Sequence, residues 1–150
     1  MAADVNLDRV RDLAGHLRDA LRQLRALAEP SLEVFAADRR TANAAKYLLI
    51  VACEAALDIC NHVAARRAGR SPEDYADCMT VLAELGALPP ELARRLARMA
   101  RFRNLLVHLY ARVDDAEVHR VMREDLGDLE QYLVALGQYL RADIDGPPDR

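Results

Sequence analysis

The chain has no tryptophan, two phenylalanines and a total aromatic content of 5%. It is also poor in residues that break helices, with six glycines and six prolines in 150 residues. Aromatic and β-branched residues are enriched in β-strands. Ala, Leu and Arg are good helix formers, and all three are abundant in this chain. The composition therefore argues against a sheet protein and a low-complexity chain, and it predicts an all-α fold.

Cysteine is scarce as well. Cys53, Cys60 and Cys78 are odd in number, and none belongs to a Cys-x-x-Cys pair. This usage is typical of buried free thiols in a reducing compartment, not of a disulfide-stabilised secreted protein. No apolar run approaches the roughly 20 residues that cross a bilayer, and the first residues lack the order of a signal peptide. We therefore predict a cytoplasmic protein with three free thiols and no membrane contact.

The length and the spread of polar residues predict one domain. With 52% hydrophobic and 30% charged residues, a chain of 150 residues can bury a substantial core. No glycine-rich or serine-rich linker divides it. We expect a single helical domain over residues 1–144 and a flexible tail over residues 145–150, where Asp-Gly-Pro-Pro-Asp-Arg disfavours a helix.

Apolar residues recur at helical spacing, in segments separated by proline, glycine and capping residues. The resulting helices, about five in number, are expected over residues 5–28, 38–67, 72–85, 90–112 and 114–141. Residues 31–38 are expected to form a helical turn and connector. The middle of the second helix, residues 46–63, is the most apolar part of the chain, so it is predicted to be the central helix of the bundle.

The segment 101–110, Arg-Phe-Arg-Asn-Leu-Leu-Val-His-Leu-Tyr, concentrates polar groups within two turns of a predicted helix. Arg103, Asn104, His108 and Tyr110 are separated there by aliphatic residues. Arginine offers a permanent forked cation suited to phosphate, and histidine moves protons near neutral pH. These are the groups that cleavage of a phosphodiester without a metal requires.

The charge around this segment differs from that of the rest of the chain. The formal net charge is −3, yet residues 92–113 contain six arginines and no acid, and residues 114–150 contain ten acids and four arginines. A local basic surface can bind nucleic-acid phosphate even on an acidic protein. Each arginine taken singly is equally compatible with a solvated helix face, which is how we interpret the same Arg-x4-His spacing at Arg11 and His16.

Helix geometry separates the two main groups of the motif. An ideal helix advances about 100° per residue, so Arg103 and His108 would point roughly 140° apart. Arg103 nearly shares a face with Tyr110, and Asn104 shares another with His108. One helix therefore positions the Arg–His pair poorly for a single phosphate, unless it bends. A two-fold dimer would place two arginines and two histidines around one groove, so the motif predicts a homodimer.

A second polar stripe lies on the central helix. Glu54, Asp58 and His62 follow one another at intervals of four, with Asn61 beside them. Buried carboxylates need partners or a wet cleft. The stripe is either a structural network, in which Asp58 pairs with His62 and Glu54 with an arginine, or a cleft lining in which Glu54 and Asp58 support the 101–110 motif. A metal site is disfavoured because the Glu-x-x-His repeats of bundle metal sites are absent, and no cofactor is predicted.

Residues 103–110, Arg-Asn-Leu-Leu-Val-His-Leu-Tyr, resemble the Arg-x4-His-x-Tyr signature of HepT-like toxins, within the HEPN class of helical ribonucleases. Residues 47–62 are similar to that family's central helix, 71–75 to its connector and 92–99 to its approach to the motif. The resemblance covers about residues 5–140. It implies an antiparallel helical bundle that forms homodimers, with the Arg and His of both subunits at a shared cleft.

The resemblance further implies the toxin of a type VII-like toxin–antitoxin system. Such toxins are metal-independent endoribonucleases, and their partner antitoxin, a minimal nucleotidyltransferase, transfers AMP from ATP to the motif tyrosine, here Tyr110. Arg103 and His108 would then be catalytic: the RNA 2′-hydroxyl attacks, His108 moves the proton, and Arg103 stabilises charge at phosphorus. Asn104 would support this pair by contacting the imidazole or the phosphate.

Two other functions remain open. The chain could be a non-catalytic helical dimer that presents substrate to a nucleotidyltransferase. It could also be a helical interaction module in which the motif is a satisfied buried network and Tyr110 is a core tyrosine. The intact Arg–His pair favours the ribonuclease, because neither alternative needs it.

Overall fold

The computed structural model describes residues 4–145, and these contain helices and no strand. The elements are α1 (Leu7–Leu27), α2 (Leu32–Ala37), α3 (Arg39–Arg67), α4 (Tyr75–Glu84), α5 (Pro90–His108), the 3-10 turn η1 (Tyr110–Arg112), α6 (Asp115–Glu124) and α7 (Leu126–Leu140). The all-α prediction is confirmed. Residues 146–150 of the predicted tail lie outside the described residues.

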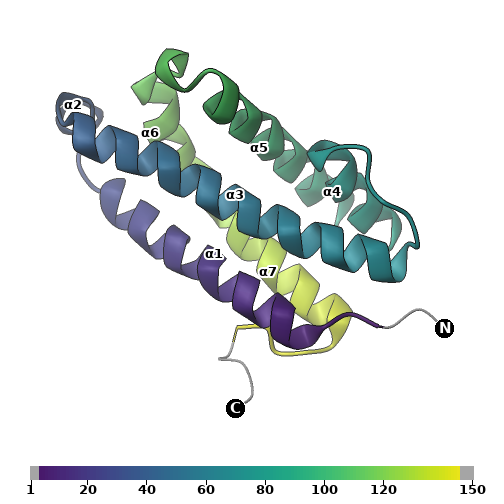
Figure 1. Cartoon of the computed structure of the whole chain (residues 1–150). Helices are drawn as coiled ribbons and strands as arrows, with labels where there is room; N and C mark the ends of the chain where they lie inside the picture. The colour runs from purple at the N-terminus through teal and green to yellow at the C-terminus, as the bar shows by residue number, and fades with distance from the viewer. Residues whose placement is uncertain (1–3, 146–150) are drawn as a thin grey trace.

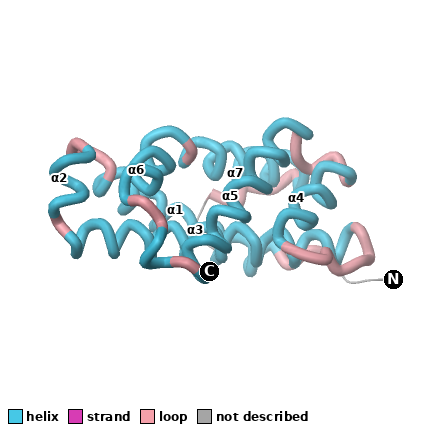
Figure 2. Tube along the Cα trace, turned by 90° about the horizontal axis from the view of Figure 1, so that it is seen from above, coloured by secondary structure: helices cyan, strands magenta, loops and turns pink. Residues whose placement is uncertain are grey.

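The long helix α3 runs through the middle of the bundle and packs against α1, α4 and α5 (Figure 1). α1 and α5 run antiparallel to α3, and α7 returns on the far side of the molecule (Figure 1). Seen from above, α4 lies beside α5 at one end, and α2 lies beside α6 at the other (Figure 2). This arrangement places the carboxyl end of α5, which carries the motif, at the same end of the molecule as the start of α3.

Small side chains explain how α3 contacts so many neighbours. Six of its thirteen buried residues are alanines, which let other helices approach closely. Tyr132 of α7 is fully buried and donates a hydrogen bond of 2.7 Å to the carbonyl oxygen of Ala56. Within the described part of the chain, α3 alone is long and apolar enough to span a membrane, but 56% of its most apolar window is buried inside the bundle. It is therefore placed as a core helix.

The number of helices differs from the expected five. The connector contains a true helix, α2, and its Phe35 is fully buried. The predicted final helix over 114–141 is divided at Asp125 into α6 and α7. α6 is held against the α1–α2 connector, because His119 Nε2 lies 2.8 Å from the Pro30 carbonyl oxygen and Arg123 donates to the Ala28 carbonyl oxygen. These long-range bonds fix a direction for α6 that periodicity within the segment does not reveal.

The cysteines also differ from expectation. Cys60 of α3 and Cys78 of α4 form a disulfide, so the prediction of three free thiols is wrong for this pair. Their separation of 18 residues carries no local signal, and only the packing of α4 on α3 brings them together. Cys53 is free and buried, and desolvation raises the pKa of its thiol to about 12. It is therefore a protonated core residue at neutral pH.

Candidate functional site

The helix that carries the motif ends earlier than the sequence predicts. α5 ends at His108 instead of 112, and the chain turns through η1 before α6 begins. Tyr110 therefore does not share a helix face with Arg103, and that expectation is wrong. The turn is stabilised by Lys46 of α3, whose Nζ donates a hydrogen bond of 3.2 Å to the Tyr110 carbonyl oxygen. A contact from another helix thus decides where α5 ends.

Arg103 is held by three neighbours at the junction of α3, α4 and α5. Its guanidinium donates through Nη2 to Glu54 Oε1 and through Nη1 to Asn104 Oδ1 at 2.9 Å. The guanidinium carbon lies 4.7 Å from the centre of the Tyr75 ring, a cation–π distance. The side chain is 14% exposed, and its buried Nε has no hydrogen-bond partner among the described residues. Glu54 therefore pairs with an arginine, and Asn104 binds Arg103, not the imidazole.

His108 occupies a different environment. It is the last residue of α5 and is exposed, and its ring makes no hydrogen bond or ion pair with any residue of the described chain. No bond joins it to Arg103. The chain therefore presents a fixed, largely buried arginine and a solvent-accessible imidazole that do not contact each other.

Tyr110 lies where η1 meets α3. Its hydroxyl donates a hydrogen bond of 3.1 Å to the Asn43 carbonyl oxygen, and its ring centre lies 5.0 Å from Lys46 Nζ. Lys46 is 3% exposed and also lies 3.6 Å from a carboxylate oxygen of Asp115. Tyr110 itself is 36% exposed, so it is not a core tyrosine. Nothing in the 101–110 segment indicates this support, although a lone lysine within the most apolar helix is a visible signal.

The remaining members of the polar stripe lie away from the motif. The predicted pair between Asp58 and His62 does not form, because His62 Nε2 accepts a hydrogen bond of 2.9 Å from the backbone N–H of Asn6. Both residues line a surface groove of about 410 Å³ with Arg9 and Arg66. Desolvation and the neighbouring Glu54 raise the pKa of the exposed Asp58 carboxyl. Residues 4–145 contain no cluster of three His, Cys, Asp or Glu side chains placed to hold a metal ion.

The bond to His62 makes a pH dependence of stability predictable. Burial, followed by the charges of Arg66 and Arg9, lowers the pKa of His62 below its ordinary value. The unfolded chain therefore binds a proton at His62 more readily than the folded protein does. The contribution of neutral His62 to stability is complete above its ordinary pKa of about 6.5, and it is lost as the pH falls through the lower pKa of the folded protein. We expect the free energy of unfolding to fall by about 1 kcal/mol on this account.

Urea unfolding at a series of pH values measures this effect. His62→Gln should flatten the dependence, while His16→Gln, at an exposed position, should leave it unchanged. An identical pH profile for wild type and His62→Gln would contradict the assignment.

The fold matches that of known HEPN toxins. The tri-AMPylated HEPN toxin of Shewanella oneidensis, solved in complex with its MNT antitoxin, superimposes with a TM-score of 0.80 at 23% identity, covering 87% of this chain and 98% of that one. YutE of Bacillus subtilis, described as a cytosolic protein of unknown function, gives 0.79 at 19% identity and covers 97% of both chains. At these identities the likeness establishes the fold alone.

Sequence comparison gives the family. Residues 17–136 match the family model described as ribonuclease HepT-like, and the chain belongs to this family. The mRNA nuclease HepT of S. oneidensis is 32% identical over 81 residues, which are 54% of this chain and 61% of that protein. A putative RNase of Archaeoglobus fulgidus is 40% identical over 68 residues, 45% of this chain and 51% of that protein. The matched segments span less than two thirds of either relative.

Proposed function

We propose that this protein is a metal-independent endoribonuclease and the toxin of a toxin–antitoxin pair, neutralised when a minimal nucleotidyltransferase antitoxin transfers AMP to Tyr110. Membership of the HepT-like ribonuclease family and the relative named mRNA nuclease HepT support the activity. The observation that carries the proposal is the arrangement at the end of α5. Arg103 is held in a fixed position, and the His108 and Tyr110 side chains are open to solvent within two residues of each other.

The chemistry follows from these groups. The 2′-oxygen of RNA attacks the adjacent phosphorus and displaces the 5′-oxygen of the next nucleotide, which leaves a 2′,3′-cyclic phosphate and a 5′-hydroxyl. One imidazole removes the proton of the 2′-hydroxyl, and a protonated imidazole supplies a proton to the leaving oxygen. Arg103 stabilises the negative charge that builds up on the phosphoryl oxygens. The attacking and leaving oxygens both belong to the substrate. The protein therefore has to supply only the groups that transfer protons and the positive charge that stabilises the phosphoryl oxygens.

Two proton transfers and one motif histidine per subunit favour a homodimer. Large apolar side chains are exposed around the motif, with Leu105 at 49%, Val107 at 42% and Leu109 at 43%. Tyr47, 63% exposed, lies one helical turn after Asn43, the residue that binds the Tyr110 hydroxyl. Contiguous exposed apolar residues mark association surfaces. Pairing two copies through this surface would bring two Arg–His pairs to one RNA strand.

Modification of Tyr110 would oppose RNA binding directly. The Tyr110 oxygen would leave its hydrogen bond to Asn43 and attack the α-phosphorus of ATP, releasing pyrophosphate. The attached AMP would place a bulky anion next to His108, where it opposes RNA both by occupancy and by charge repulsion. The structural neighbour described as a tri-AMPylated toxin with an MNT antitoxin supports this partner. The Cys60–Cys78 disulfide removes the argument from free thiols, and we propose the cytoplasm because RNA and ATP are both found there.

Cleavage of RNA in the presence of a chelator tests the activity. Purified protein should produce fragments whose 5′ ends accept phosphate from polynucleotide kinase without prior dephosphorylation, and whose 3′ ends carry a cyclic phosphate. The absence of cleavage at every enzyme concentration would overturn the proposal. That result would favour the non-catalytic substrate-binding subunit. The ion pair between Arg103 and Glu54 also supports this alternative, because it neutralises the arginine.

A further inference from the structure

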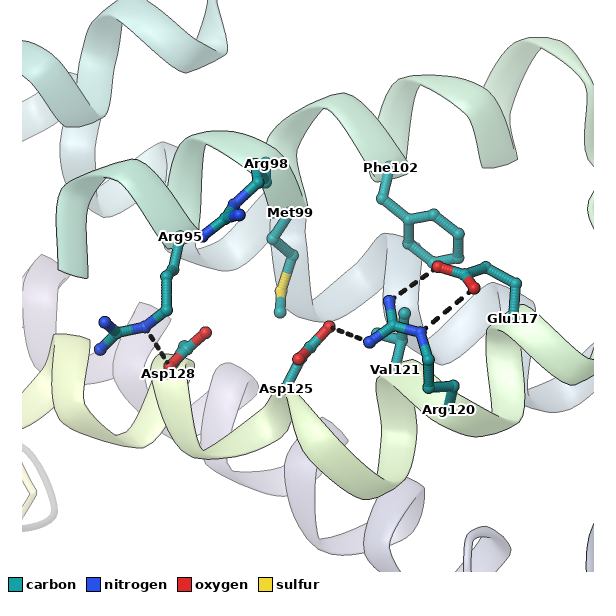
Figure 3. A pocket seen from close by; sticks show the side chains of 9 residues that line it. All are labelled: Arg95, Arg98, Met99, Phe102, Glu117, Arg120, Val121, Asp125 and Asp128. Carbon is teal, nitrogen blue, oxygen red and sulfur yellow. Dashed lines mark hydrogen bonds and ion pairs between the residues drawn. The ribbon is translucent and has the colours of Figure 1, made fainter. Parts of the chain in front are cut away.

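The arginines of α5 fall into two groups. Some are neutralised by an acid, and these pairs are Arg94 with Glu91, Arg95 with Asp128 and Arg103 with Glu54. Arg98 and Arg101 are exposed and make no hydrogen bond or ion pair with any residue in the described chain. Figure 3 shows the difference: Arg95 and Arg120 are joined to carboxylates, and Arg98 beside them is not.

Arg101 lies on the side of α5 that leads to His108, and Arg98 lies about 80° from His108 around the helix. Arg101 precedes His108 by seven residues, which on an ideal helix is two turns, with an angular offset of about 20°. Arg98 lies one turn further back. At 1.5 Å per residue the two guanidinium-bearing positions are about 10 and 15 Å from His108 along the helix axis. Arg101 therefore lies in line with the exposed imidazole, and Arg98 lies one turn behind it, between this groove and the neighbouring pocket beside α6 and α7.

The same two arginines line a groove between α4 and α5. The groove has a volume of about 670 Å³, and its walls are formed largely by short side chains, including Ala76, Thr80 and Ala97. Short walls leave room for a chain to lie between the helices.

The acids that line this groove are already engaged. Asp77 accepts hydrogen bonds from Arg70 Nη1 and from the Glu73 backbone N–H, and Glu91 binds Arg94. Arg98 also acts on the Glu91 carboxylate through space, but within the described chain neither Arg98 nor Arg101 forms an ion pair in the groove.

We propose that this groove, the α4–α5 groove, binds the backbone of single-stranded RNA, with Arg98 and Arg101 contacting phosphates that neighbour the one cleaved at His108. The inference rests on the proposed ribonuclease function and adds the path of the substrate. An arginine without a carboxylate partner can bind phosphate without first breaking an ion pair, whereas Arg94 and Arg95 cannot. A groove with free cations and small walls suits an extended polyanion, because contacts to the backbone do not depend on sequence.

Binding of fluorescent oligouridine, measured by anisotropy over a range of salt concentrations, tests this assignment. The His108→Ala protein serves as the parent, so that the RNA stays intact. Arg98→Gln/Arg101→Gln should bind about tenfold more weakly, and the slope of log affinity against log salt should decrease by about 1.4, since each lost contact to a single strand contributes about 0.7. Arg95→Gln/Arg120→Gln is the matched control, because both arginines are paired with acids and lie outside this groove, and it should keep the parental slope.

Catalysis provides a second measurement. With His108 intact, the Arg98→Gln/Arg101→Gln enzyme should show a raised KM and an unchanged kcat. Unchanged RNA affinity and an unchanged salt slope in this variant would overturn the inference. Intact RNA binding together with a loss of antitoxin binding would also overturn it, because the groove would then bind a protein partner. A wild-type protein that binds RNA through these arginines but never cleaves it would remove the proposed activity and leave the groove assignment standing.

Discussion

His108→Ala is expected to reduce the rate of RNA cleavage by about 10²- to 10⁴-fold, the usual contribution of a general acid or base. The side chain is exposed at the end of α5 and has no hydrogen-bond partner in the described chain, so its removal leaves the fold and the position of Arg103 unchanged. Because the histidine acts on protons and not on substrate binding, the affinity for RNA should change little. The loss should therefore appear in kcat.

A matched histidine is available as the control. His16 on α1 follows Arg11 at the same spacing, but it lies on a solvated face, where Nε2 is 3.9 Å from a carboxylate oxygen of Asp12. His16→Ala should retain full activity, and thermal unfolding of both variants checks that neither has lost its fold. If His108→Ala cleaved RNA at the wild-type rate, the assignment of the motif as the catalytic centre would be wrong.

Tyr110→Phe is expected to abolish the gain of AMP while RNA cleavage persists. Phenylalanine keeps the ring beside Lys46 and removes only the hydroxyl, whose one hydrogen bond, to the Asn43 carbonyl oxygen, contributes about 1 kcal/mol. The oxygen that would attack ATP is absent, so the effect on modification should be complete. Intact-mass measurement after incubation with ATP and the antitoxin detects it, and a cleavage assay on the same sample should show an enzyme that the antitoxin no longer silences through AMP.

Tyr47 is the control for this experiment, because it is a tyrosine on the same surface and is more exposed, at 63%. Tyr47→Phe should still gain AMP. Modification of Tyr110→Phe at the wild-type level would assign the acceptor to another residue, and loss of modification only in Tyr47→Phe would name that residue.

Local signals in the sequence predicted most of the bundle. Asp38 and Asp114 were expected to begin helices, and each side chain accepts a backbone N–H in the first turn that follows. The predicted range of 72–85 starts α4 too early, because Asp74 caps this helix and Tyr75 begins it. Several polar side chains in the loop before α4 could cap the helix, and which of them does so depends on how the surrounding helices position the loop. Boundaries are therefore less predictable than helices.

The candidate site was predictable in its composition but not in its geometry. The order and spacing of Arg103, Asn104, His108 and Tyr110 indicated phosphodiester chemistry and the HepT-like family. They did not indicate that Tyr75 lies against the guanidinium of Arg103, or that a lysine of α3 holds the Tyr110 turn. Both partners are distant in sequence from the groups they contact.

The sequence by itself determined the helical class, the central place of α3 and the set of polar groups at the end of α5, because periodicity, caps and motif spacing act within a few turns of chain. Tertiary structure alone decided the partner of each polar group. It paired Glu54 with Arg103, separated His62 from Asp58, joined Cys60 to Cys78 and left Arg98 and Arg101 free. Such pairings depend on which helix faces meet, and that follows from the packing of the whole core.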